Sequence, residues 1–142
     1  MRLRSQIEQI SVGEKIVAII VRSRFNPNGI EFVTPEHLDL QVGYMSRPSG
    51  YEIQPHIHVP RTRMVETTQE VLFVRKGNVR VDFYNDEHRH VKSTQISSGD
   101  LILLTGGGHG FEMLDDTELI EVKQGPHLPD DKIRFNSPSN KE

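Results

Sequence analysis

The sequence predicts an all-β protein, built as a sandwich or a barrel. Short segments rich in valine, isoleucine, phenylalanine and threonine alternate with turn signals such as Asn26–Gly29, Arg47–Gly50 and Ser97–Asp100. Many short strands with closely spaced turns are typical of these two architectures. We find no amphipathic helix; residues 36–40 are compatible with one short helical turn.

Four segments carry the strand prediction. Residues 79–83 alternate between apolar and polar side chains, which is the two-residue period of a half-buried strand. Residues 15–21 are apolar from Ile16 onward and residues 101–104 are apolar throughout, as expected of strands covered on both faces. Residues 119–122 are predicted to form the last core strand. A further strand is expected over Leu38–Ser46.

The length of 142 residues predicts a single domain, 1–142, with a barrel core over about 14–124 and a mobile tail over about 136–142. A net charge of −3, from 17 basic and 20 acidic residues, disfavours a nucleic-acid surface. The longest apolar run, Ile16–Val21, is far shorter than the ~20 residues needed to span a membrane. With no targeting segment visible, we expect a cytoplasmic protein that binds neither membrane nor nucleic acid.

Histidine supplies the most informative motif. The chain has no cysteine and seven histidines, so any metal must be held by imidazoles and carboxylates. In a strand, His56 and His58 would lie on one face and Ile57 on the other. The pair His88 and His90 has the same spacing, but it follows a polar turn and is interpreted as solvated surface.

Two clusters around these histidines resemble the motifs of the cupin family. The first family motif is a glycine, a His-x-His pair, a glutamate at a strand start and a closing glycine, which match Gly50, His56, His58, Glu70 and Gly77. The second motif matches at Gly99, Gly107 and His109, whereas Thr105 replaces the family proline and Met113 the family asparagine. The two motifs span residues 50–113.

This resemblance implies a cupin-like double-stranded β-helix, a jelly-roll barrel, in which the two motifs lie on neighbouring strands. His56, His58, Glu70 and His109 would then converge inside the barrel. Three imidazoles and one carboxylate suit a divalent transition metal ion, Fe, Mn, Ni or Zn, with positions left open for substrate. The alternative is a barrel whose ligand set is retained but empty.

Two departures from the family pattern bear on the site. Eleven residues separate His58 from Glu70 where the family has three or four, which makes Glu66 a rival carboxylate. We prefer Glu70, because its distance to Gly77 keeps the motif's spacing. His109 comes one residue early, which would reverse its direction within a strand, but we expect the surrounding glycines to form a turn that absorbs the change.

The resemblance implies two classes of function. The first is a metal-dependent isomerase, epimerase or dioxygenase acting on a small polar or sugar-related metabolite, with Tyr44 or Glu66 as candidate bases and Arg61 and Arg63 as candidate anion-binding residues. The second is a binding module for a small molecule or a metal without turnover. A metal-free isomerase or epimerase of sugar nucleotides is a further alternative. We also expect a homodimer formed through the strand over Ile16–Val21.

Overall fold

The computed structural model describes residues 6–136, and this part of the chain is all-β, with no α-helix. The all-β prediction is therefore confirmed. Ten strands follow one another: β1 (Ile7–Val12), β2 (Lys15–Val21), β3 (Gly29–Phe32), β4 (Gly43–Ser46), β5 (Glu70–Lys76), β6 (Asn78–Tyr84), β7 (His90–Ser97), β8 (Leu101–Leu104), β9 (Gly108–Met113) and β10 (Glu118–Lys123).

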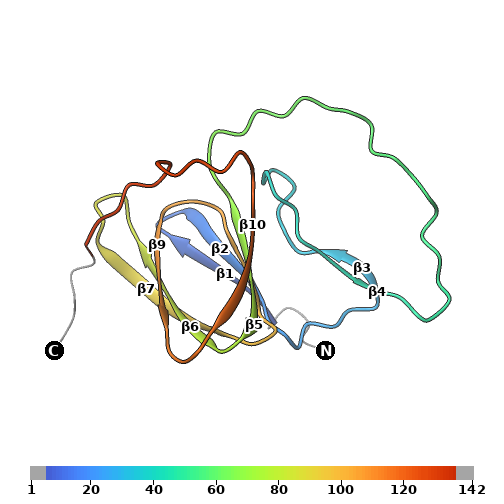
Figure 1. The fold of residues 1–142 in the computed structure, drawn as a ribbon, viewed down its shortest axis with the longest axis horizontal. Helices are drawn as coiled ribbons and strands as arrows, with labels where there is room; N and C mark the ends of the chain where they lie inside the picture. Colours follow the sequence, from blue (N-terminus) through green and yellow to red (C-terminus); the bar gives the residue numbers. More distant parts are fainter. Residues whose placement is uncertain (1–5, 137–142) are drawn as a thin grey trace.

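The strands form three antiparallel sheets (Figure 1). The largest has the order β1-β2-β8-β5-β10, and the second has the order β7-β6-β9. The third is the β3–β4 hairpin, which lies to one side of the other two sheets (Figure 1). No sheet closes into a barrel among the described strands, because β9 and β10 each pair with a single neighbour.

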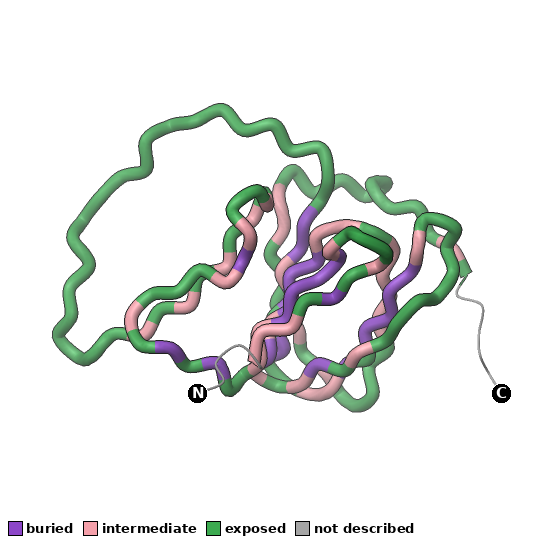
Figure 2. The backbone as a smooth tube through the Cα atoms, turned by 180° about the vertical axis from the view of Figure 1, so that it is seen from behind, coloured by how far each residue is buried: buried purple, intermediate pink, exposed green. Residues whose placement is uncertain are grey.

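The core lies between the five-stranded and the three-stranded sheet. Apolar side chains from one sheet, such as Ile20, Leu72 and Ile102, meet others from the second sheet, such as Val81 and Phe83, and all of them are buried. Alternating residues of each strand point inward, so the two-residue period seen in the sequence produces this face. Figure 2 shows the buried residues concentrated along the central strands.

The predicted strands over residues 15–21, 79–83, 101–104 and 119–122 correspond to β2, β6, β8 and parts of β10. The expectation that β2 contributes a dimer edge is wrong. Hydrogen bonding to β1 on one side and β8 on the other leaves β2 no free edge, and its residues Val17–Ile20 are buried.

Three other expectations are corrected. Residues 36–40 form turns and no helix, and the strand expected over Leu38–Ser46 is confined to β4. No strand forms over His56 and His58, because the whole segment between β4 and β5 lacks a pairing partner.

The tail expected to be mobile lies almost wholly outside the described residues. Within residues 6–136, no helix is long and apolar enough to cross a membrane.

Candidate functional site

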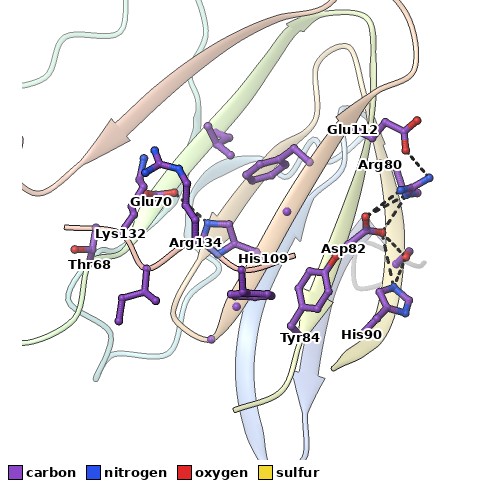
Figure 3. Close-up of a pocket in the computed structure, with 18 of the residues that line it drawn as sticks. Thr68, Glu70, Arg80, Asp82, Tyr84, His90, His109, Glu112, Lys132 and Arg134 are labelled. Carbon is purple, nitrogen blue, oxygen red and sulfur yellow. Dashed lines mark hydrogen bonds and ion pairs between the residues drawn. The ribbon is translucent and has the colours of Figure 1, made fainter. Parts of the chain in front are cut away.

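Glu70 and His109 meet at the open side of the two-sheet core. Glu70 is the first residue of β5, and His109 is the second residue of β9, so each sheet contributes one side chain. Nε2 of His109 lies 3.5 Å from Oε2 of Glu70 (Figure 3). The sequence placed both residues in one site, and the structure brings these two together.

The position of His109 differs from the turn expected for it. Gly106 and Gly107 form the turn, both with positive φ, and the strand begins at Gly108. His109 pairs with Phe83, whose side chain is buried in the core, so the imidazole shares that inward face. The one-residue displacement in the motif is therefore absorbed before the strand begins.

The electrostatics of the pair follow from partial burial. The Glu70 side chain is 10% exposed and that of His109 is 28% exposed. The imidazole of His109 lowers the pKa of Glu70 below its ordinary value of 4.5, and this effect outweighs burial, which acts in the opposite direction. Nδ1 of His109 is buried and has no hydrogen-bond partner among the described residues. An unpaired buried nitrogen costs about 1–3 kcal/mol, and such groups are concentrated at functional sites.

A pocket of about 1370 Å³ surrounds this pair and extends around the edge of β9. Its inner wall carries Glu70, His109 and Phe111, and the segment before the C-terminus adds Lys132 and Arg134 (Figure 3). Charged groups of both signs therefore face one open cavity. Such a lining suits a small polar ligand that carries hydroxyl or anionic groups.

A second polar cluster lines the same pocket on the other face of β6. Nε2 of His90 lies 2.7 Å from the Ser93 hydroxyl, and that hydroxyl donates to the carboxylate of Asp82. Nε of Arg80 donates to Asp82 at 3.0 Å. Burial raises the pKa of Asp82, but the hydrogen bonds from Arg80 and Ser93 together hold it below its ordinary value of 3.8.

Sequence reasoning missed this cluster. His90 is exposed, as the sequence predicted, but it is also bonded to Ser93 and its ring packs edge-on against Tyr84, with 5.7 Å between the ring centroids. The available signal was Asp82 on the polar face of β6, but an alternating strand gives no indication of which polar residue is buried. His88 stacks on Phe135 at 4.2 Å.

The remaining predicted residues lie away from the Glu70–His109 pair. His56, His58, Arg61, Arg63 and Glu66 all belong to an exposed segment between β4 and β5 that extends away from the two main sheets (Figures 1 and 2). Tyr44 is on β4, where its hydroxyl donates to Asn26 at 3.0 Å; it does not line the pocket.

The four predicted metal ligands are not brought together within the described residues: Glu70 and His109 meet, but His56 and His58 lie on the exposed segment. Among residues 6–136, no group of three or more potential ligands is gathered. The rings of His56 and His58 lie next to each other, with their centroids 5.3 Å apart, and Nδ1 of His56 lies 2.9 Å from the carbonyl oxygen of Gln54. As a donor to that carbonyl, Nδ1 leaves Nε2 with a free lone pair, which is the tautomer a metal-binding histidine uses.

Comparison of the chain with protein-family models, with curated proteins and with solved structures finds no match. The likeness to cupins consequently rests on the two sequence motifs, and function must be argued from the geometry of the site.

Proposed function

We propose that the protein binds a small polar, sugar-related metabolite in the pocket beside β9 and acts on it as an isomerase or epimerase, with His109 and Glu70 as the acid–base pair. The observation that carries this proposal is their 3.5 Å contact in an open pocket, supplied by the two facing sheets. We further infer that these sheets are the two halves of a cupin-like jelly roll whose side between β9 and β10 is open.

The chemistry needs one group that takes and returns a proton. An imidazole ionises near neutral pH and is suited to this role. Nδ1 is buried, so Nε2 is the nitrogen assigned to substrate. Nε2 also faces Glu70, but at 3.5 Å this contact is longer than a good hydrogen bond, so substrate takes its place while the carboxylate stays alongside the ring. Nε2 takes the proton from a carbon next to a carbonyl and returns it to the opposite face or the neighbouring atom. The Glu70 carboxylate stabilises the imidazolium meanwhile.

The other pocket residues fit a substrate of this class. Lys132 and Arg134 line the pocket and provide cations for a phosphate or carboxylate group. The pocket is large enough for a drug-sized molecule. A pocket that only binds such a ligand would use the same cations but would not need the acid–base pair.

The experiment is a screen of sugar phosphates and sugar nucleotides, with binding measured calorimetrically and turnover followed by exchange of substrate hydrogen with deuterated water. His109→Gln should abolish exchange and retain binding within a few-fold, because it removes the base and keeps a polar side chain. His37→Gln, an exposed histidine outside the pocket, is the matched control and should change neither. Binding without exchange in the unmodified protein would identify a binding module and overturn the catalytic proposal.

Metal-dependent chemistry is the second candidate, favoured by the approach of Nε2 of His109 to the Glu70 carboxylate and by the tautomer of His56. Glu70 and His109 would hold the ion together with His56 and His58, and the ion would polarise a substrate carbonyl. The residues of one chain do not by themselves meet this requirement, because the two ligand pairs lie on separate segments.

Metal content after reconstitution tests this candidate. His56→Ala and His58→Ala should each abolish stoichiometric metal, since no cysteine is available as a replacement ligand. Glu70→Gln should weaken binding and Glu66→Gln should not. His88→Ala combined with His90→Ala is the spacing-matched control and should retain full metal content. Loss of metal in Glu66→Gln and not in Glu70→Gln would identify Glu66 as the ligand.

A further inference from the structure

The segment between β4 and β5, residues 47–68, which we call the arm, lies entirely exposed. Ile57 is 90% exposed, Met64 84% and Val59 72%. Two hydrogen bonds involve residues 48–68, from Tyr51 to Pro48 and between His56 and Gln54, and both lie within the arm. Neither reaches the two main sheets. Figure 2 shows the arm as a continuous exposed loop away from the buried strands. Apolar surface of this extent needs a partner.

The arm nevertheless has the sequence of a strand. From Tyr51 to Val59 the residues alternate without interruption between a mainly apolar set and a polar set, and the polar set is Glu52, Gln54, His56 and His58. That period is typical of a half-buried strand, with one face against protein and the other face polar. A strand pattern in a fully exposed segment indicates that its pairing partner lies elsewhere.

The main sheets offer the matching edge. Within the described part of the chain, β9 pairs only with β6, and β10 pairs only with β5, so each keeps one row of unpaired backbone groups. Residues of both strands line the pocket that holds Glu70 and His109. An added strand at β9 would continue the three-stranded sheet and cover the open side of this pocket.

Charge complementarity favours the arm as that strand. Residues 56–63 contain two histidines and two arginines and no carboxylate. The pocket lining contains more carboxylates than lysines and arginines; Glu112 already pairs with Arg80, so Glu70 and Glu121 are the acidic groups on the strands that the arm would meet. Bringing the basic part of the arm to this edge therefore pairs opposite charges.

We propose that two copies of the chain exchange their arms, so that the arm of each copy pairs with β9 of the other and carries His56 and His58 to the Glu70–His109 pair. A second copy fits because the arm of each chain extends away from the two main sheets (Figure 1). Reciprocal exchange across a two-fold axis gives each arm a β9 edge to pair with and gives each β9 edge a neighbouring strand. The purpose of the completed site rests on the proposed function, but the exchange itself does not.

The pairing predicts a specific contact. With His56 and His58 on the inward face beside His109, the intervening Ile57 lies on the outward face opposite Gly108 or Gly110. A Cβ at Gly108 would meet Phe135 at 3.0 Å, whereas a Cβ at Gly110 meets only the Tyr84 ring, at 3.7 Å. Gly110 is therefore the position that accepts a substitution.

Disulfide trapping tests this contact, and the absence of native cysteine makes it unambiguous. We expect the full-length double variant Ile57→Cys/Gly110→Cys to give a covalent dimer on a non-reducing gel after mild oxidation, and a monomer after reduction. The single variants Ile57→Cys and Gly110→Cys, co-expressed with different tags, should give the disulfide-linked heterodimer. If Gly110→Cys does not fold, Glu112→Cys, two residues along on the same face, replaces it, and the arm cysteine moves by two residues as well, to Pro55→Cys or Val59→Cys according to the strand direction.

The control pairs Ile57→Cys with Val91→Cys, an exposed apolar position on β7, and should give no more dimer than random collision. A disulfide within one chain would show that the arm closes onto its own sheets and would overturn the exchange, as would the absence of any link. None of these outcomes depends on substrate or metal. Failure of the exchange is therefore distinguishable from failure of the proposed function.

Discussion

Asp100 shows how one buried carboxylate secures the end of a sheet. The residue is 5% exposed and accepts hydrogen bonds from the backbone N–H groups of Ser23 and Ser97, at 2.8 and 2.9 Å. It also accepts from Nη1 of Arg22 at 3.0 Å. It therefore joins the turn before β8 to the segment that leaves β2.

Replacing this carboxylate should be costly. We expect Asp100→Ala to lower the free energy of unfolding by about 1–3 kcal/mol, because it removes the acceptor of two part-buried N–H groups and one of the acceptors of the Arg22 guanidinium, which keeps Glu8 and the Gln95 carbonyl. Urea denaturation measures the change. Asp116→Ala, at an exposed turn position, is the control and should stay within about 0.5 kcal/mol; equal losses in both variants would show that the Asp100 bonds contribute little.

At the site, the pKa of Glu70 reports the contact with His109. The depressed pKa means that this carboxylate contributes stability above its ordinary value of 4.5, and that the contribution is lost as the pH falls through the lowered value. In His109→Phe the pKa of Glu70 should rise, since the favourable contact disappears and burial alone raises it. Carbon-detected NMR titration of the carboxyl group measures this shift. An unchanged pKa would mean that His109 does not interact with Glu70 in solution.

At the scale of the strands, Gly77 determines how β5 turns into β6. Its φ is +92°, a conformation that favours glycine, and an added Cβ would lie 2.6–2.7 Å from atoms of Thr117, Asp115 and Asp116. The glycine that the sequence motif placed at the end of the Glu70 strand is therefore required by the neighbouring β9–β10 turn as well as by its own backbone.

Gly77→Ala should consequently destabilise the protein by about 2–3 kcal/mol, the sum of left-handed strain and steric contact. Gly13→Ala is a matched control: φ there is +61°, but no atom lies within 4 Å of the added Cβ, so the cost should be only about 1 kcal/mol. Thermal unfolding of the two variants compares these costs. Equal costs would exclude a steric contribution at Gly77.

At the scale of the whole molecule, arm exchange predicts a particular assembly. Sedimentation at tens of micromolar should give a species of about twice the 16.2 kDa chain mass. Ile57→Asp together with Val59→Asp should shift the distribution towards monomer, because charged residues would replace apolar ones on the face expected to pack. Val91→Asp, which is exposed and lies outside both the arm and the pocket, should not. A monomer at this concentration in the unmodified protein contradicts the assembly.

The sequence by itself determined the fold class and selected two residues of the candidate site, Glu70 and His109. Hydrophobic period and turn chemistry are local properties, so β2, β6 and β8 follow directly from residues 15–21, 79–83 and 101–104. The motif spacing also selected Glu70 and His109, because a glutamate at a strand start and a histidine after a glycine turn are fixed relative to their own strands.

The tertiary structure decided what those strands pair with. Residues 51–59 have a strand pattern, yet they form no strand within one described chain, because pairing needs a neighbouring edge as well as the right side chains. Likewise, the sequence did not predict that Ser93 of β7 bonds to Asp82 of β6, because only the register of the two strands places them opposite each other. Pairing and burial depend on residues distant in the chain, which is why the sequence alone did not determine them.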